Sequence, residues 1–396
     1  MTSAQGHRPG SAAYRRLNWA MLMAGIAAFG MLYSTQPLLP QIGNAFEVSA
    51  TAAALTVSAG TGGLAVTVVV ATWIGERVGR ARVMRVGLVV AVVAQLISTA
   101  MPTFELLIVA RGILGLALAG LVGVAMGHVG AEVHPAGLGQ AMGLYVAGNS
   151  IGGVFGRLVT SGVSEFASWR VADAALGLCA GVAAIAFVLL LPPSDQVTHR
   201  QLPPPLRPDR RAWLRPEVWA LALVPFLLMG GFVALYNYLT YRLVAPPFSL
   251  SPAVVGLVFL AYLAGSVTSA LAGRAADRLG RLSAITVCLA LMALGIVATL
   301  PDTLWLVVAG LVVLTAGFFG AHAVASGWMP LIGRGLGPLA SGVYVSAYYA
   351  GSSILGAAVG IAWMQGGWPA TATTVLVLTA LAGGCVAVVA ARRIDP

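Results

Sequence analysis

The chain has little charge and no lysine. Its 22 basic residues are all arginine, only 12 of its 396 residues are acidic, and charged residues make up 9% of the total. Soluble domains carry about a quarter charged residues, whereas this chain is 59% hydrophobic. A soluble fold cannot hide that much apolar surface, so these proportions exclude a water-soluble domain and indicate a protein surrounded by lipid.

Cysteines are few, and the common catalytic patterns are missing. Cys179, Cys288 and Cys385 lie in apolar runs, with neither disulfide nor metal-ligand spacing. The sequence holds no nucleotide-binding loop, HExxH, paired catalytic carboxylates or nucleophile elbow, and its glycine-rich stretch at 60–63 lies inside an apolar run. We therefore expect no enzyme activity, no cofactor and no metal. Because no ATP site is visible, any energy that the protein uses should come from an ion gradient.

Twelve apolar runs are long enough to cross a bilayer, which takes roughly twenty residues. The first run follows Arg15-Arg16 and is too long for a cleavable signal core, so we expect a span there. A proline- and arginine-rich stretch at 192–216 separates the runs into two sets of six and is typical of a polar linker. The predicted spans are Leu17–Leu39, Ala50–Ile74, Val83–Ala100, Phe104–Val129, Leu138–Ser161, Val171–Leu191, Val218–Tyr241, Ala253–Ala276, Ser283–Leu300, Leu304–Gly327, Leu339–Trp363 and Ala370–Ala391.

Arginine placement predicts the orientation. With the N-terminus in the cytoplasm, the tails, the linker and the loops after the second, eighth and tenth spans hold every arginine except Arg111, Arg157, Arg170 and Arg242. Both termini are then cytoplasmic, and we expect a multi-pass protein of the cell inner membrane. The positive-inside rule also explains the net charge of +10, so we expect no nucleic-acid partner.

The two halves of the chain resemble each other at an offset of about 203 residues. Phe29 and Tyr33 match Phe232 and Tyr236 at this offset. In the fifth and eleventh spans it pairs Gly148, Ser150 and Gly153 with Gly351, Ser353 and Gly356. We therefore predict two six-helix repeats, an N-terminal bundle at 1–191 and a C-terminal bundle at 217–396, joined by a cytoplasmic linker at 192–216. Parallel repeats of this kind place a binding site between them near mid-bilayer.

A charged tight turn occurs after the second span and again after the eighth. In the second copy, Gly280 allows the chain to reverse, the arginines stay at the anionic cytoplasmic surface, and Asp277 can pair with an arginine or with a helix N-terminus. The turns act either as latches that hold one conformation or only as topology signals. The candidate gating residues are Glu76, Arg77, Arg80, Asp277, Arg278 and Arg281.

Aromatic and mildly polar residues gather in the outer parts of the first and seventh spans. Phe29, Tyr33 and Gln36 share one helical face. A wall of this kind suits an amphipathic organic solute, and the alternative is an aromatic belt at the membrane interface. The candidate substrate-binding residues are Phe29, Tyr33, Gln36, Asn149, Phe232, Tyr236, Asn237, Tyr348 and Tyr349.

Few charges lie within the predicted spans. Arg111 lies about 10 Å deep, where an arginine costs roughly 2.5–3.5 kcal/mol and needs a partner. Because arginine cannot release its proton, a neighbour has to carry it. Asp173 lies at the depth of Arg111 and Arg157 and is the first candidate; His128, His322 or the substrate are the others. Asp173 either exchanges an arginine partner for a buried environment, and so loads and releases a proton, or forms a fixed salt bridge with Arg157.

These residues resemble the major facilitator superfamily. Asp277-Arg278-x-Gly280-Arg281, preceded by Gly273, is similar to its loop signature after helix 8, whereas the copy after helix 2 departs from it at Thr72 and Glu76. Arg111-Gly-x-x-Gly115 resembles the helix 4 signature, in which the arginine is linked with proton coupling. Gly148-Asn149-Ser150-Ile151-Gly152-Gly153 is similar to the antiporter signature of helix 5, with asparagine where proline is usual. The chain as a whole is similar to the YnfM-type branch, which is grouped with drug/proton antiporters.

The resemblance implies an all-α membrane protein with twelve transmembrane helices in the major facilitator fold, and a central cavity lined by helices 1, 4, 7 and 10. We expect a monomeric secondary transporter that exports small organic or amphipathic compounds in exchange for protons by alternating access. One alternative is an importer or facilitator of a metabolite such as a sugar or an organic acid. The other is a membrane receptor that does not transport.

Overall fold

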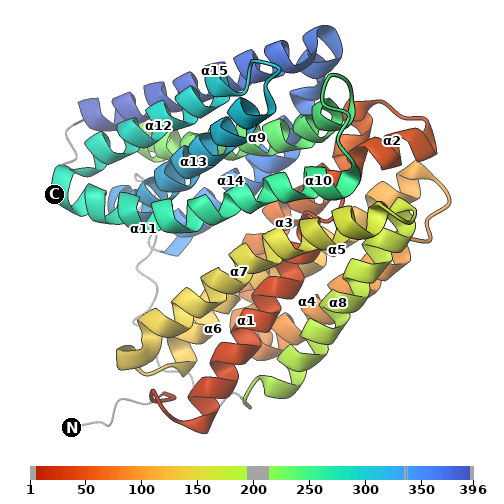
Figure 1. The fold of residues 1–396 in the computed structure, drawn as a ribbon. Helices are drawn as coiled ribbons and strands as arrows, with labels where there is room; N and C mark the ends of the chain where they lie inside the picture. Colours follow the sequence, from red (N-terminus) through yellow and green to blue (C-terminus); the bar gives the residue numbers. More distant parts are fainter. Residues whose placement is uncertain (1–5, 194–213, 334–335, 337, 393–396) are drawn as a thin grey trace. The chain divides into compact units, whose positions relative to one another are not determined.

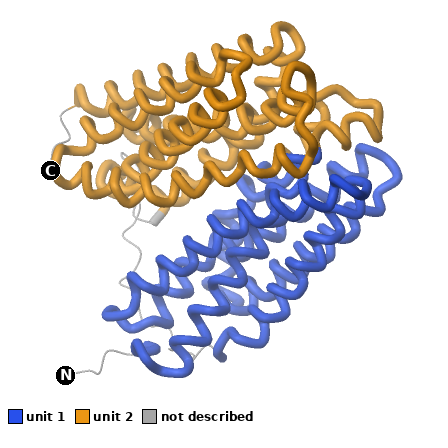
Figure 2. The backbone as a smooth tube through the Cα atoms, in the orientation of Figure 1, with its two compact units in different colours: residues 1–38, 59–200 blue, residues 39–58, 201–396 orange. Residues whose placement is uncertain are grey.

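The computed structural model describes residues 6–193, 214–333, 336 and 338–392, and this part of the chain is built from helices (Figure 1). The predicted linker falls almost entirely on 194–213, outside the described residues. The described chain forms two compact units (Figure 2). Unit 1 takes its residues from 1–38 and 59–200, and unit 2 takes its residues from 39–58 and 201–396. A short piece of the first half, residues 39–58, is therefore grouped with the second half.

Unit 1 contains seven α-helices and one 3₁₀ turn, and polar caps fix several of its helix starts. Side-chain oxygens of Ser11, Thr103 and Ser168 accept amide hydrogen bonds at the N-termini of α1, α5 and α8. Gly79 separates α3 from α4 with a φ of 103°, a value that favours glycine. The elements are α1 (Ala12–Leu32), η1 (Gln36–Leu38), α3 (Ala50–Val78, from residue 59), α4 (Arg80–Ser98), α5 (Phe104–Val122), α6 (Ala125–Glu132), α7 (Pro135–Ser164) and α8 (Trp169–Leu190).

Glycines let α7 pack directly on the backbone of α1. A Cβ atom added at Gly148, Gly152 or Gly156 would lie 2.5, 2.4 or 2.5 Å from a main-chain oxygen of α1. These three glycines recur every fourth residue, so they share one face of α7. Close backbone contact through small residues is the usual way that helices associate in a membrane.

The segment before α1 docks onto the connection between α6 and α7. The amide of His7 donates to the carbonyl of Glu132 at 2.7 Å, and the amide of His134 donates back to the carbonyl of His7 at 3.1 Å. The hydroxyl of Tyr14, in the first turn of α1, donates to the carbonyl of Gly137 at 3.0 Å. These bonds fix the start of α1 against the start of α7.

Unit 2 contains the remaining elements. Residues 39–58 join it through the hydroxyl of Tyr241, which donates to the carbonyl of Leu39 at 2.9 Å, and through Ser353, which donates to the carbonyl of Ser58 at 2.8 Å. The elements are α2 (Leu39–Phe46), the start of α3, α9 (Pro216–Val244), α10 (Pro252–Leu257), η3 (Val258–Ala261), α11 (Tyr262–Leu279), α12 (Arg281–Ala298), α13 (Leu304–Ile332), α14 (Pro338–Ala358) and α15 (Gly360–Ala391). The helical path of α15 breaks at Gly366 and Gly367, between the predicted eleventh and twelfth spans.

The packing of α9 on α14 repeats that of α1 on α7. A Cβ atom at Gly351 would lie 2.0 Å from the carbonyl oxygen of Phe226, just as one at Gly148 would meet the carbonyl of Leu22. Gly351 lies 203 positions after Gly148. The offset found in the sequence therefore also relates two helix contacts, one in each unit.

Ten stretches of the described chain are long and apolar enough to cross a membrane. The first, Ala12–Phe46, takes in α1, η1 and α2. Outside these ten, α7 and α14 have 30 and 21 residues, which corresponds to about 45 and 32 Å of helix. Both lengths reach across the hydrocarbon core of a bilayer, about 30 Å thick, so the prediction of twelve spans stays compatible with the helix lengths.

Candidate functional site

A break in the first span forms the centre of the polar core of unit 1. The α-helix ends at Leu32, a turn follows, and η1 begins at Gln36. A helix end leaves carbonyl groups without partners inside the helix, and at this depth water is not at hand to satisfy them. Pro37 and Pro40 follow directly, and proline disfavours helix in the residue before it.

Arg111 of α5 supplies side-chain donors to this end of α1, where the carbonyl of Met31 also accepts from the amide of Ser34 at 3.3 Å. Its Nη2 donates to the carbonyls of Met31 at 3.1 Å and Leu32 at 2.9 Å. Its Nη1 donates to Oε1 of Gln95 at 2.9 Å and to the hydroxyl of Ser34 at 3.3 Å. The side chain is fully buried. A charged guanidinium is thus held in the membrane by neutral acceptors, and it ties α5 to the broken end of α1.

Asp173 of α8 lies beside this arginine and is also fully buried. Arg111 is the charged group that acts on it, and Ser34, Gln95 and Ser98 lie within reach. Among the described residues, however, none donates a hydrogen bond of standard geometry to either carboxylate oxygen. The side chain is therefore close to a cation without being paired to it.

Arg157 of α7 holds the other side of the break. Its Nε donates to Oε1 of Gln36 at 2.8 Å, its Nη1 donates to the carbonyl of Gly153 at 2.7 Å, and its guanidinium lies 4.7 Å from the ring centre of Tyr33. The fixed salt bridge between Arg157 and Asp173, one of the two interpretations of the sequence, is not formed in the described structure. Arg157 instead reaches toward the turn after α1, while Asp173 lies with Arg111.

The residues predicted to bind substrate are placed in two different settings. In unit 1, Tyr33 and Gln36 are buried beside Arg157, whereas Phe29 and Asn149 are half-buried on α1 and α7. In unit 2, Asn237 is buried and donates to the carbonyl of Gly356 at 3.1 Å, within the contact between α9 and α14. Their assignment to a substrate site stays a prediction.

The other predicted residues of unit 2 belong to a large aromatic group. Phe232 and Tyr236 of α9 have ring centres 5.0 Å apart, and Tyr348 and Tyr349 of α14 have ring centres 5.1 Å apart. Sequence reasoning missed the other rings of this group because they come from separate elements. They are Phe259, Tyr262, Phe318 and Phe319, and they are joined by Tyr344 and by His322, which was considered as a proton carrier.

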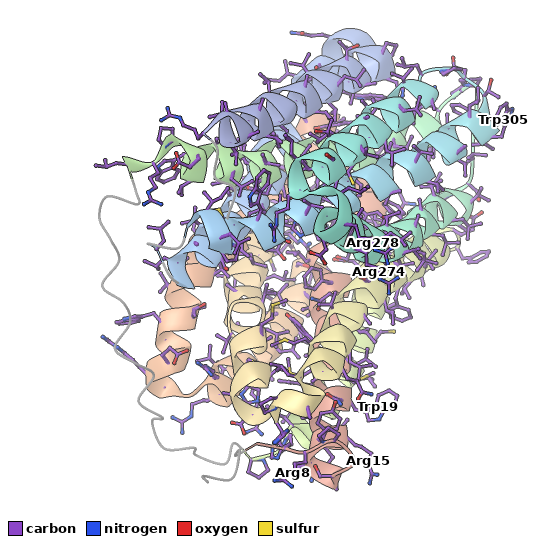
Figure 3. All side chains as sticks on the ribbon, turned by 90° about the vertical axis from the view of Figure 1, so that its left-hand side faces the viewer. Arg8, Arg15, Trp19, Arg274, Arg278 and Trp305 are labelled. Atoms are coloured by element: carbon purple, nitrogen blue, oxygen red, sulfur yellow. The ribbon has the colours of Figure 1, made fainter. Side chains whose placement is uncertain are left out.

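The charged turns differ between the two units. In unit 1, Arg80 binds Glu76 at 2.6 Å and the carbonyl of Gly127 at 2.7 Å, and Arg77 lies 3.6 Å from the ring centre of Trp73. In unit 2, Gly280 reverses the chain with a φ of 85°. There Asp277, Arg278 and the nearby Arg274 are exposed, and Arg281 is half-buried (Figure 3). Asp277 forms no ion pair within the described part of the chain, so the role of both turns as latches stays a prediction.

A helical protein with this many apolar spans belongs to the class of multi-pass membrane proteins, and the comparisons identify the family. Residues 21–245 match the sequence profile of the Major Facilitator Superfamily. The chain belongs to this superfamily, as its sequence motifs predicted.

Relatives of this chain cover nearly its whole length. It is 37% identical to the uncharacterized MFS-type transporter YybF of Bacillus subtilis (strain 168), over 91% of this chain and 90% of YybF. It is also 37% identical to the inner membrane transport protein YnfM of Escherichia coli (strain K12), over 91% of this chain and 87% of YnfM. The predicted similarity to YnfM is thereby confirmed.

Solved structures confirm the fold. The nucleoside transporter NupG superimposes with a TM-score of 0.73 at 14% identity, covering 95% of this chain and 100% of NupG. A bacterial homolog of the human lysosomal transporter Spinster, in an inward-facing and occupied conformation, gives a TM-score of 0.71 at 14% identity and covers 96% of both chains. The protein is therefore an all-helical membrane transporter with the major facilitator fold.

Proposed function

We propose that this protein is a proton-coupled exporter of small organic or amphipathic compounds that works by alternating access as a monomer. It resides in the cell inner membrane with twelve spans and both termini in the cytoplasm. An N-terminal bundle at 1–191 and a C-terminal bundle at 217–396 act as its two moving halves, joined by a cytoplasmic linker. The observation that carries the proposal is the buried group of Arg111, Asp173 and the broken end of α1.

Asp173 is the proton carrier in this proposal. A buried carboxylate without a partner favours the protonated form, whereas a nearby arginine favours the ionised form. When Asp173 is protonated, Arg111 remains on the carbonyls of Met31 and Leu32, as in the structure. When Asp173 loses its proton, the carboxylate competes with these neutral carbonyls for the guanidinium, because a charge-assisted hydrogen bond is stronger than one to a neutral acceptor.

This competition links the proton to the conformation. If Arg111 turns to Asp173, the end of α1 loses two of its hydrogen bonds, and the break between α1 and η1 is free to change its angle. Protonation reverses the step. Arg157 keeps its contacts to Gln36 and Gly153 throughout, so it acts as the fixed support on the other side. The charged turns at Glu76–Arg80 and Asp277–Arg281 serve as latches for the two states.

The test is the variant Asp173→Asn in proteoliposomes, with a substrate first found by thermal-shift screening of a compound library on the wild-type protein. Coupling through Asp173 predicts loss of flux driven by a pH gradient, while substrate binding and substrate exchange are retained. The exposed carboxylate of Glu105, at the start of α5, provides the control Glu105→Gln, which should behave as wild type. Normal pH-driven flux in Asp173→Asn would remove Asp173 as the carrier and leave His128, His322 or the substrate.

The direction of transport needs a separate measurement. Membrane vesicles of both orientations, each with an imposed pH gradient, distinguish an exporter from an importer or facilitator of a metabolite. Export requires substrate to leave the cytoplasmic face when the opposite side is acidic. Uptake under the same gradient would overturn the assignment as an exporter.

A further inference from the structure

The aromatic rings of unit 2 form one continuous group drawn from five elements. Phe232 and Phe318 are stacked with centres 4.0 Å apart and an angle of 10°. His322 continues this column, lying 14° from the plane of Phe318, and its ring centre is 4.7 Å from that of Tyr348. Tyr262 meets Phe232 edge-on at 5.3 Å. The rings therefore support one another, so each is held in a defined orientation.

Part of this group is accessible. Phe232 and Phe318 are buried and form its floor, whereas Tyr262, His322 and Tyr348 are half-buried and keep part of their surface accessible. These three come from α11, α13 and α14. We call Tyr262, His322 and Tyr348 the aromatic rim. A buried floor of rings beneath three accessible rings provides π surface that a ligand can cover.

The aromatic rim lies in the middle of the spans, away from their ends. Tyr348 is the eleventh of the 21 residues of α14, and Tyr262 is the eleventh of the 28 residues of the span Pro252–Leu279. Aromatic belts occur at the membrane interfaces, so a belt does not account for these positions. Directly before Tyr262, the span is interrupted by the 3₁₀ segment Val258–Ala261. Transporters place interrupted helices at their binding sites near the bilayer midplane.

The polar atoms of the group fix what kind of ligand it can hold. The hydroxyl of Tyr236 is paired with Thr315 at 2.8 Å, and Nδ1 of His322 lies 2.9 Å from the hydroxyl of Tyr344. When Tyr344 donates to Nδ1, Nε2 of His322 carries the hydrogen and can donate it to a ligand. One hydrogen-bond donor at the edge of an apolar aromatic surface is the pattern of a small-molecule site.

Charge is the second constraint. The described residues of α13 and α14 include no Asp, Glu, Lys or Arg, and His322 is the one titratable imidazole among them. The charged residues of α9 and α11 lie toward the helix ends. A charged ligand on the aromatic rim would lose its hydration without gaining an ion pair, which is costly. The charged groups of the membrane interior lie in unit 1 instead, with Arg111, Arg157 and Asp173.

We propose that the aromatic rim of Tyr262, His322 and Tyr348 is a stacking site for an uncharged planar aromatic compound that accepts one hydrogen bond from His322. The site rests on the proposed transport function and names its substrate class. It also assigns different roles to the two units: unit 1 holds the charged residues of proton coupling, and unit 2 binds the aromatic ring of the ligand.

The test uses equilibrium binding to the purified full-length protein in lipid nanodiscs, measured by calorimetry without a pH gradient. The probes are acetylnaphthalene, its saturated analogue acetyldecalin, the anion naphthoate and the cation naphthyltrimethylammonium. Acetylnaphthalene should bind most tightly. An aromatic pair contributes roughly 0.5–1.5 kcal/mol beyond its buried area, so Tyr348→Leu should weaken this binding about three- to tenfold.

Matched variants separate stacking from general damage. Tyr348→Phe keeps the ring and should keep the affinity, and Phe155→Leu, which removes an exposed ring from α7 in unit 1, should also keep it. Equal binding of acetyldecalin and acetylnaphthalene, or equal loss in Tyr348→Leu and Phe155→Leu, would overturn the stacking site. Tighter binding of the cation or the anion would overturn the uncharged class.

The two proposals fail separately. Binding is measured here without a proton gradient, so a wrong assignment of Asp173 leaves these affinities unchanged. A wrong assignment of the aromatic rim leaves the pH-driven flux of other substrates unchanged.

Discussion

The contact between α1 and α7 allows a quantitative prediction about Gly152. A Cβ atom at this position would lie 2.4 Å from the carbonyl oxygen of Ile26 and 2.6 Å from its Cα atom. An ordinary contact of a carbon atom needs roughly 3.5 Å, so Gly152→Ala has to push the two helices apart by about 1 Å. Overpacking of this kind costs about 1–3 kcal/mol.

Gly143 of the same helix provides the matched control, because an added Cβ there meets nothing within 4 Å. Gly143→Ala should gain up to about 1 kcal/mol from helix propensity. Gly152→Ala shares this gain in helix propensity, so the free energies of unfolding of the two variants should differ by about 1–3 kcal/mol, the cost of the overpacking. The 9 tryptophans of the chain allow the unfolding to be followed by fluorescence during titration of a mixed micelle with dodecyl sulfate. Equal stability of the two variants would show that α7 moves freely along α1, and the packing argument would be wrong.

Four further predictions concern the charged and polar contacts. Arg111→Lys should insert normally but slow pH-driven flux at least tenfold, because lysine has a single nitrogen and cannot take the separate positions of Nη1 on Gln95 and Nη2 on the carbonyls of α1; wild-type flux would contradict this. Tyr14→Phe should lower the free energy of unfolding by about 1 kcal/mol and speed hydrogen exchange at the start of α7, and unchanged exchange would count against the docked segment. Glu76→Gln breaks an exposed ion pair and should cost less than about 1 kcal/mol, and less still at high salt; a larger loss would point to a structural role. Asp277→Asn should increase labelling of a cysteine placed on the cytoplasmic side, whereas unchanged labelling would leave the arginines of this turn as topology signals.

Much of the fold could be predicted from the sequence, because membrane spans and repeats are patterns along the chain. The length of an apolar run predicts a membrane span without any knowledge of the helices that pack against it. The offset that relates Gly148 to Gly351 was visible in the sequence and reappears as a pair of helix contacts. The turn at Gly280 was predicted from its glycine alone, since a reversal of this kind favours a positive φ.

The first span shows where the same reasoning fails. Its apolar run continues from Leu17 to Leu39, so the sequence predicts one continuous helix, yet the structure ends α1 at Leu32. Hydropathy averaged over the length of a span does not detect the break, because the polar Ser34, Thr35 and Gln36 are flanked by apolar residues on both sides. Pro37 and Pro40 were the local signal that was available. Which residues support the break depends on partners about 80 or 120 positions away, Arg111 and Arg157, and spacing along one helix does not reveal such pairs.

The residues of the candidate sites also fall into those that the sequence could predict and those that it could not. Arg111 and Asp173 could be singled out because a charge in an apolar run is rare, and the structure places them together. The aromatic group could be found only in part, because its rings come from five elements and each ring by itself is an ordinary core residue. Asn237 was predicted to contact solute because of its polarity; it donates to the backbone of α14, and its contact with solute stays a prediction.

The docked segment before α1 has a consequence for how this protein is made. His7 is bridged to Val133, 126 positions later in the chain. At roughly 5–20 residues per second, its partner leaves the ribosome about 6–25 s after it. During that interval α1 enters the membrane with its N-terminal end unattached, and α3, α4 and α5 follow it. Formation of the bridge therefore marks the moment at which the first four spans have been delivered, and a ribosome stalled before Val133 holds a nascent chain whose first helix has no anchor.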